Sequence, residues 1–293
     1  LAKLNSQQII SSEFAEKISE ALSENSCILA VSQSGETSDT LSAINFAKKY
    51  NAKISAITNV VGSSITRAAD YFIYTLAGPE IGVAATKTFL VQISTLALLG
   101  LSLAKVRGIL DPSEVQKLHG QLLNIPNHIE QIIEKQEDYI KSTADRLATK
   151  PNFLFLGRGI NTPTAMEGAL KLKEISYIHA EAYPAGESKH GPIALVESDF
   201  PVMFIAPSDN TFDRIIGNIM EMKARGARII SVTDNRKVHE LSDHTFWIPS
   251  EVPEVFTPLV SVVPLQLFSY YSAIRRDYNP DKPRNLAKSV TVL

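Results

Sequence analysis

The sequence contains little cysteine, no block of basic residues and no long apolar run. Its single cysteine, Cys27, cannot form an internal disulfide, as is usual for proteins of a reducing compartment. Cys27 begins the apolar run 27–31, which predicts a small buried side chain rather than a reactive thiol. The 29 Lys and Arg residues and 31 Asp and Glu residues leave a net charge of -2. We expect no nucleic-acid partner, because neutralising a phosphate backbone requires clustered cations.

No uninterrupted apolar stretch reaches the roughly 18 residues that a transmembrane helix needs. The longest candidate, 89–104, contains Gln92, Ser94 and Thr95, so we expect a helix of the protein core and no membrane partner. No secretory signal pattern begins the chain, which favours a cytoplasmic protein. The six histidines show no metal-binding spacing and no complete GxGxxG is present, so we expect no metal site and no dinucleotide.

Short apolar runs alternate with longer amphipathic stretches, a pattern typical of parallel strands joined by helical crossovers. We therefore predict an α/β fold with parallel sheets flanked by helices. The predicted strands are 27–31, 54–58, 71–75, 153–156, 202–206, 229–233 and 245–248.

The order of these elements occurs twice, which indicates an internal duplication. Residues 56–59 match 231–234, and 69–72 match 242–245, so both pairs lie about 174 residues apart. This offset places the counterpart of strand 153–156 before residue 1. We therefore expect the first copy to lack its opening strand and most of its first helix.

The duplication also suggests how the chain is divided. A polar segment with two prolines begins near residue 277, and it can neither extend a helix nor join the centre of a sheet. The predicted divisions are a first domain over 1–110, a helical linker over 111–150, a second domain over 151–276 and a C-terminal lid over 277–293.

The segment 32–37, Ser-Gln-Ser-Gly-Glu-Thr, follows a predicted strand and precedes a predicted helix. This is the carboxyl edge of a parallel sheet, where ligands bind and where a helix start offers free N–H groups to an anion. Donors without a lysine suit a phosphomonoester rather than a nucleotide P-loop. The alternative is that Ser34 or Thr37 only caps the helix, and the pattern favours neither interpretation.

Glu167, Lys171 and Glu174 share one face of a predicted helix, because they are four and three residues apart. Solvated ion pairs are the commoner meaning of such a row. The helix is predicted to continue through the apolar stretch 175–183, however, so a carboxylate there would be partly desolvated and its pKa raised toward that of a general base. Two further segments are the glycine-bearing loop 78–87 and the histidine-bearing turn 187–192. Their patterns do not distinguish a ligand site from an ordinary connection.

Four segments, 32–40, 80–83, 167–192 and 283–292, together resemble a known family. They are similar to the isomerase half of the glucosamine-6-phosphate synthases, the isomerizing glutamine:fructose-6-phosphate aminotransferases. The first segment is shared by sugar-isomerase (SIS) domains generally, whereas KLKEISYIHAEAY and NLAKSVTV are more specific. The resemblance implies two SIS domains, each a parallel sheet flanked by helices.

The resemblance also implies a sugar-phosphate site. The residues that match the phosphate-binding positions are Ser32, Gln33, Ser34 and Thr37. The residues that match the sugar pocket are Val83, Ala85 and Ala287, with Ala85 standing where the family often has serine. The tail is expected to close over the sugar.

Four residues match the family's catalytic groups. Glu174 matches the base that moves a proton between C1 and C2, and Lys171 matches the residue that assists near O1 and O2. His190 matches a ring-opening group that reaches across a dimer interface, so a homodimer is expected. Lys288 matches a tail lysine that also takes part in ring opening. Such groups interconvert an aldose and a ketose without a metal or other cofactor.

The resemblance implies a phosphosugar substrate, fructose-6-phosphate, which is converted with ammonia to glucosamine-6-phosphate. The glutaminase domain that would release ammonia is absent from this sequence and is expected in the full-length enzyme. One alternative is a stand-alone SIS deaminase or isomerase of aminosugar phosphates, which the tail disfavours. The other is a non-catalytic phosphosugar sensor, which would have no use for the four catalytic matches together.

Overall fold

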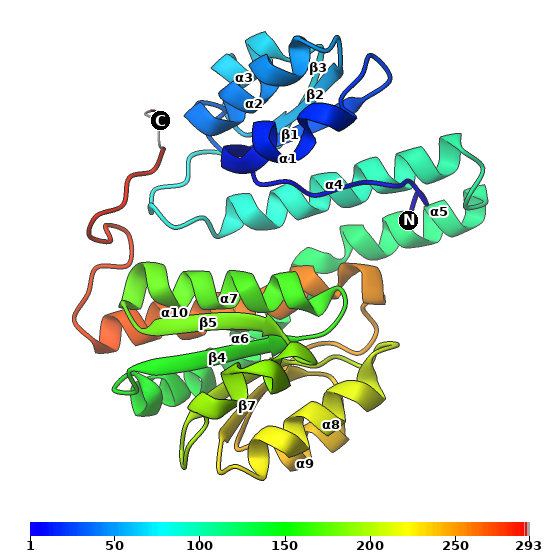
Figure 1. Ribbon diagram of the computed structural model, residues 1–293. Helices are drawn as coiled ribbons and strands as arrows, with labels where there is room; N and C mark the ends of the chain where they lie inside the picture. The colour runs from blue at the N-terminus through cyan, green and yellow to red at the C-terminus, as the bar shows by residue number, and fades with distance from the viewer. Residues whose placement is uncertain (290, 292–293) are drawn as a thin grey trace. The chain divides into compact units, whose positions relative to one another are not determined.

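The computed structural model in Figure 1 describes residues 1–289 and 291, and of residue 19 only the backbone. Residues 290, 292 and 293 belong to the predicted lid 277–293 and lie outside the described residues. The chain divides into two compact units: unit 1 comprises Leu1–Leu118 and Asn285–Leu293, and unit 2 comprises His119–Arg284. The predicted domain boundaries near residues 110, 150 and 276 stay predictions, since compactness alone does not define a domain.

Unit 1 contains a three-stranded parallel sheet in the order β1-β2-β3 (Figure 1). Its elements are β1 Cys27–Ser32, β2 Lys53–Thr58, β3 Tyr71–Tyr74, α1 Phe14–Ile18, α2 Ser38–Lys48, α3 Ser64–Ala68, α4 Lys87–Val106 and α5 Pro112–Leu123, the last of which runs into unit 2. The three predicted strands are confirmed to within one residue. The core packs α1, α2 and α3 against β1 and β2, and Ile44, Ile54 and Ile65 are fully buried in it.

Cys27 is exposed, so its predicted burial is wrong. β1 is an edge strand of the sheet, and Leu29 and Val31, which share a face with Cys27, are each 39% exposed. Successive side chains of a strand point to opposite faces, and the face that carries Ala30 and Ser32 is the covered one. The apolar run thus predicted the strand correctly, but a run cannot show whether both faces are covered.

The predicted core helix 89–104 forms as α4, but its predicted burial is wrong for unit 1 taken by itself. Of its residues, Thr88, Leu101 and Ala104 are buried. Within the described residues, α4 is the one helix that is long and apolar enough to cross a membrane. Its most apolar stretch has a mean hydropathy of 1.8, and 11% of the residues in that stretch are buried. Core helices of soluble proteins pass the same test, so it is weak evidence for a membrane span. A three-stranded sheet is too small to cover a helix that is about 30 Å long.

Unit 2 contains a five-stranded parallel sheet in the order β5-β4-β6-β7-β8. Its strands are β4 Asn152–Gly157, β5 His179–Pro184, β6 Pro201–Ile205, β7 Arg228–Thr233 and β8 His244–Trp247. Its helices are α6 Ile125–Leu147, α7 Asn161–Ser176, α8 Phe212–Lys223, α9 Arg236–Leu241 and α10 Thr257–Arg275. Helix α10 packs against α6 and α7. Four predicted strands are confirmed to within one residue.

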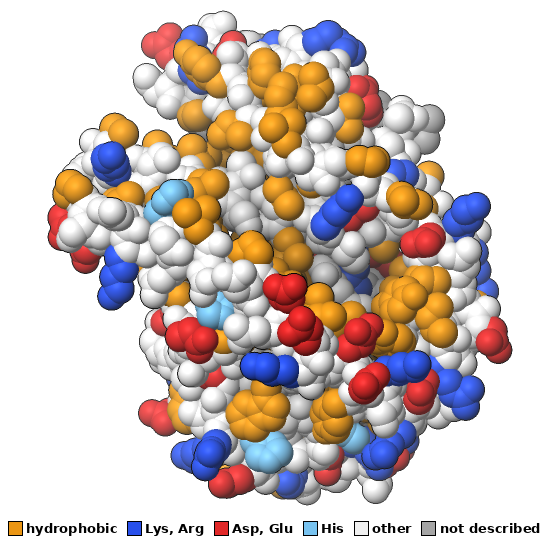
Figure 2. Space-filling model, turned by 180° about the vertical axis from the view of Figure 1, so that it is seen from behind, with side chains coloured by type: hydrophobic (Ala, Val, Ile, Leu, Met, Phe, Trp, Pro, Cys, Tyr) orange, Lys and Arg blue, Asp and Glu red, His pale blue; other side chains and the backbone are white. Residues whose placement is uncertain are grey.

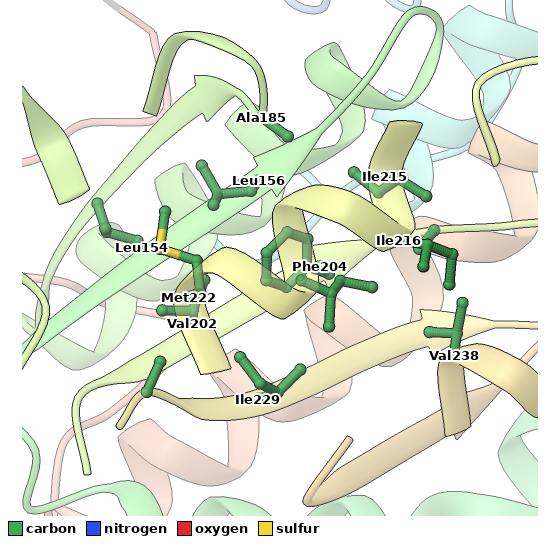
Figure 3. Close-up of a cluster of buried hydrophobic side chains, with 13 residues drawn as sticks. Leu154, Leu156, Ala185, Val202, Phe204, Ile215, Ile216, Met222, Ile229 and Val238 are labelled. Carbon is green, nitrogen blue, oxygen red and sulfur yellow. The ribbon is translucent and has the colours of Figure 1, made fainter. Parts of the chain in front are cut away.

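One face of this sheet packs against α8, and Figure 3 shows the buried side chains between them. Leu154, Leu156 and Phe204 of β4 and β6 meet Ile215 and Met222 of α8, and all five side chains are almost fully buried. Because helices cover both faces, the strands of unit 2 are apolar along their whole length. All five residues of β6 are buried, in contrast to β1.

The predicted continuation of a helix through 175–183 is wrong beyond Ser176. The helix α7 ends at Ser176, its C-cap Tyr177 has a left-handed φ of 58°, and β5 then pairs in parallel with β4. Pairing with β4 supplies the backbone hydrogen bonds of this strand. The alternation of Ala180, Glu181 and Ala182 has the period of a strand and could have indicated β5.

The two sheets confirm the internal duplication. β1-β2-β3 corresponds to β6-β7-β8 in order and in parallel pairing. A side chain–backbone hydrogen bond recurs as well: Asp70 accepts from the Ile54 N–H at 2.8 Å, and Asp243 accepts from the Ile229 N–H at 2.7 Å. Within residues 1–289 and 291, unit 1 contains no counterparts of β4 and β5. The α/β class with two parallel sheets flanked by helices is confirmed.

Candidate functional site

The loop 32–37 joins the carboxyl end of β1 to α2 and is organised by its own side chains. Ser32 Oγ lies 3.0 Å from Thr37 Oγ1 and accepts a hydrogen bond from the Gly35 N–H at 3.1 Å. Ser34 Oγ accepts from the Glu36 N–H at 3.2 Å. Three hydroxyl groups are therefore gathered in one partly buried turn, where they can donate to an anion.

The simple capping interpretation of this loop does not hold for Thr37. Thr37 is the N-cap residue of α2, yet its side chain makes no capping hydrogen bond, and its hydroxyl faces Ser32 instead. The turn requires Gly35, because its φ is 65° and an added Cβ would lie 2.1 Å from Ser63 Oγ. This arrangement leaves the start of α2 suited to an anionic ligand.

The tail residues Lys288 and Ser289 contact two loops of unit 1. Lys288 Nζ donates to the Gly82 carbonyl at 2.8 Å and lies 3.5 Å from the Val83 carbonyl. Ser289 Oγ lies 3.1 Å from Ser34 Oγ. The tail thus touches both the candidate phosphate loop and the loop that carries Val83.

Glu167, Lys171 and Glu174 form a cluster on α7 in unit 2. Lys171 Nζ donates to Glu174 Oε2 at 2.5 Å and lies 3.4 Å from Glu167 Oε1. The side chains of Lys171, Glu167 and Glu174 are 4%, 10% and 22% exposed. The three residues are therefore not a solvated surface row, because the ammonium that the two carboxylates share is buried. Glu174 is the most exposed of the three carboxylate and ammonium groups.

Burial perturbs one carboxylate of this cluster. It raises the pKa of Glu167, and the positive charge of Lys171 opposes that shift. Burial therefore disfavours the ionised form of Glu167, and the contact with the lysine partly offsets that effect. Sequence reasoning placed Glu167 on this face without a role, and the structure shows that it shares Lys171 with Glu174.

His190 ends the short 3₁₀ helix Glu187–His190 and is exposed. The helix is held from within, because Ser188 is buried and its hydroxyl donates to the Ala185 carbonyl at 2.7 Å. The histidine side chain is therefore presented on a fixed turn. An exposed imidazole on such a turn is available to a ligand or to another chain.

The structure places every predicted site residue in one of the two units. Unit 1 holds Ser32, Gln33, Ser34, Thr37, Val83, Ala85, Ala287 and Lys288, whereas unit 2 holds Lys171, Glu174 and His190. Ala85 is half-buried and Ala287 is exposed. The contacts bring together Lys171 with Glu174, and Lys288 with the Val83 loop.

The structure adds one residue that sequence reasoning missed. Glu80 has a side chain that is 4% exposed and is paired with Lys288. Its position in the segment 78–87 had not distinguished it from an ordinary connection, and a buried carboxylate in a loop is recognised only from its contacts.

Charged side chains are otherwise dispersed. On the face drawn in Figure 2, Lys and Arg side chains alternate with Asp and Glu side chains and do not gather in one area. Among residues 1–289 and 291, no group of three or more His, Cys, Asp or Glu side chains is placed to hold a metal ion.

Comparisons with known proteins identify the family of this chain. A family model of the SIS domain matches residues 6–102 and 146–276, which is more than half of the chain. The glutamine–fructose-6-phosphate aminotransferase [isomerizing] of Thermococcus kodakarensis is 50% identical over 281 residues, 96% of this chain and 46% of that protein. The equivalent protein of Brucella abortus is 47% identical over 294 residues, 100% of this chain and 48% of that protein. The chain thus spans about half the length of the curated relatives it matches.

Solved structures show the same relationship. The C-terminal domain of glucosamine-fructose-6-phosphate aminotransferase from Francisella tularensis has a TM-score of 0.91 at 38% identity, covering 96% of this chain and 80% of that one. A glucosamine-6-phosphate deaminase from Thermotoga maritima, at 23% identity and a TM-score of 0.67, shares the fold alone. The chain therefore belongs to the SIS-domain family and, within it, to the isomerase part of the isomerizing glutamine–fructose-6-phosphate aminotransferases.

Proposed function

We propose that this chain interconverts fructose-6-phosphate and glucose-6-phosphate and, with ammonia, forms glucosamine-6-phosphate. The observation that carries the proposal is the Lys171–Glu174 pair on α7. A carboxylate held beside a buried ammonium can accept a proton, and the ammonium can stabilise an adjacent developing oxyanion.

The proton transfer needs one base that serves two neighbouring carbons. Ammonia adds to the C2 carbonyl of the open-chain ketose with loss of water, which gives an imine. Glu174 takes a proton from C1 and returns it to C2, while the hydroxyl proton on O1 passes to the imine nitrogen, which leaves an aldehyde at C1 and an amine at C2. Without ammonia the same transfer passes through an enediol, whose oxygens Lys171 stabilises.

The phosphate supplies binding energy away from the reacting carbons. In this proposal Ser32, Ser34 and Thr37 donate to its oxygens, and the Gln33 side chain adds a further donor. Binding energy at the phosphate can fix C1 and C2 relative to the base, so a truncated sugar should lose turnover as well as affinity.

Ring opening precedes proton transfer, because the ketose is mostly a closed hemiketal. His190 and Lys288 are the proposed acid–base groups of this step, with Val83, Ala85 and Ala287 along the sugar. The glutaminase domain of a longer protein would supply ammonia, and the cytoplasm is the proposed compartment.

The test of the base is the substitution Glu174→Gln. Glutamine keeps the shape and the hydrogen bonds but cannot accept the proton, so exchange of the C1 proton with solvent deuterium should be abolished while fructose-6-phosphate still binds. Glu197→Gln removes an exposed carboxylate of the same unit and should change neither quantity. NMR in D₂O measures exchange, and calorimetry measures binding. Exchange at the wild-type rate in Glu174→Gln would falsify the assignment.

We also propose a two-fold dimer in which His190 of one protomer completes the site of its partner. Support comes from the exposed, fixed position of His190 and from the family resemblance. Mixing inactive His190→Ala chains with inactive Glu174→Gln chains should then restore one working site in each heterodimer. A mixture that stays inactive although its subunits exchange would show that His190 acts within its own chain or not at all.

A further inference from the structure

Glu80 is a nearly buried carboxylate in the loop between β3 and α4. Its side chain is 4% exposed, and burial opposes its ionisation. Hydrogen bonds from Thr88, Thr86 and Lys288 outweigh that effect and hold the pKa of Glu80 below its usual value. The ionised form of Glu80 is therefore favoured inside unit 1.

The two oxygens of this carboxylate face different partners. Oε1 accepts from the Thr86 N–H at 2.8 Å, the Thr86 hydroxyl at 3.3 Å and the Thr88 N–H at 3.4 Å, which are donors at the start of α4. Oε2 accepts from the Thr88 hydroxyl and from Lys288 Nζ, the latter at 3.0 Å. Oε1 thus binds only the start of the helix, whereas Oε2 binds both the helix and the tail.

The amine of Lys288 is fixed by acceptors from a single loop. Besides Glu80, it donates to the Gly82 carbonyl at 2.8 Å and lies 3.5 Å from the Val83 carbonyl. An ammonium has three protons to donate, and Glu80 is the charged acceptor among these three partners. Because the Lys288 side chain remains 31% exposed, the two neutral carbonyls alone would compete poorly with water for it.

We propose that Glu80 is a positioning residue that holds the Lys288 amine against the Gly82–Val83 backbone. The inference rests on the proposed function in assigning Lys288 to ring opening, but the contact itself does not depend on that assignment. Glu80 sets the place of the tail lysine and the shape of the Val83 loop through one carboxylate.

The test is Glu80→Gln, which separates the two tasks of the carboxylate. The amide oxygen can keep accepting from Thr86 and Thr88, while the amide nitrogen places hydrogen-bond donors toward Lys288 and repels it. Thr86→Val is the matched control, since it removes one donor to Oε1 and leaves the Lys288 contact in place. Glu80→Asp is a second variant that keeps the charge but is one methylene too short to reach both partners.

Two measurements are made on each variant. Brief acetylation with peptide mass spectrometry reports the reactivity of Lys288 relative to the exposed Lys282. We expect Lys288 to become about tenfold more reactive in Glu80→Gln and in Glu80→Asp, the scale of one lost charge-assisted hydrogen bond, and unchanged in Thr86→Val. For isomerisation, kcat should fall about tenfold by the same reasoning, while KM changes little because the phosphate loop is intact.

The outcomes are distinguishable. Unchanged Lys288 reactivity in both Glu80 variants would overturn the proposed contact whatever the activity. Raised reactivity with unchanged kcat would overturn the positioning role. A wild-type chain with no isomerase activity would refute the proposed function, while the labelling comparison would still decide whether Glu80 holds Lys288.

Discussion

Removing the buried cation of α7 should destabilise unit 2 in a pH-dependent way. Lys171→Met is the cleanest perturbation, because methionine keeps an unbranched apolar stem of similar length and leaves only a small cavity. It takes away the ammonium that lies 2.5 Å from Glu174 and 3.4 Å from Glu167. Two partly buried carboxylates then face each other without a counter-charge.

The size of the effect follows from burial. Breaking a buried ion pair by removing one partner costs about 3–5 kcal/mol. Glu174 is 22% exposed and keeps some hydration, so we expect the lower end, about 3 kcal/mol at pH 8. At roughly 2–4 °C per kcal/mol for a domain of this size, the melting temperature should fall by about 6–12 °C.

The direction of the pH dependence follows from Glu167. Its folded pKa is raised by burial above the unfolded value of about 4.3, so the folded state disfavours the ionised carboxylate. For such a group, stability is lost as pH rises from the unfolded pKa through the folded pKa. Lys171 opposes the rise in pKa, and removing it raises the folded pKa further. The deficit of Lys171→Met should therefore be small near pH 4.5 and should grow toward pH 8.

Thermal unfolding followed by circular dichroism at pH 5 and pH 8 measures this difference. The matched control is Lys173→Met, which makes the same change of charge at an exposed position of the same helix and should stay within about 0.5 kcal/mol of wild type. An equal loss at both pH values would refute the electrostatic argument. A loss no larger than that of Lys173→Met would refute the importance of burial.

Three further expectations concern unit 1. Gly35→Ala should weaken binding of inorganic phosphate and lower the melting temperature more than Gly62→Ala. Both glycines have a positive φ, but only the Cβ added at Gly35 meets a neighbour, Ser63. Calorimetry and thermal unfolding compare the two variants, and equal losses would argue against the clash. Deleting residues 286–293 should leave the melting temperature nearly unchanged and remove most isomerase activity, since the contacts of the described tail residues Lys288 and Ser289 are polar and Lys288 is lost with them. Amide hydrogen exchange across residues 286–289 should slow at saturating fructose-6-phosphate, and identical exchange with and without the sugar would mean that the tail is no lid.

Elements with a strong local pattern were predictable from the sequence. Seven strands were located to within one residue, because each is an apolar run bounded by polar turns. The duplication was visible as matched segments about 174 residues apart, and it holds down to the paired roles of Asp70 and Asp243. The family of the chain was also evident, because its motifs combine residue types at spacings that ordinary loops do not need.

Burial, and the contacts between segments that are distant in the sequence, were decided only by the tertiary structure. Cys27 is exposed and α4 is only partly buried, because the small sheet of unit 1 leaves one face of β1 uncovered and is too short to cover the helix. No local run reveals that a covering neighbour is absent. β5 forms because β4 offers it a partner. The charge of Glu80 is tolerated because donors from α4 and from Lys288, more than 200 residues away, converge on it. Local patterns report what a segment prefers, whereas exposure, pairing and pKa depend on which distant segments the fold brings beside it.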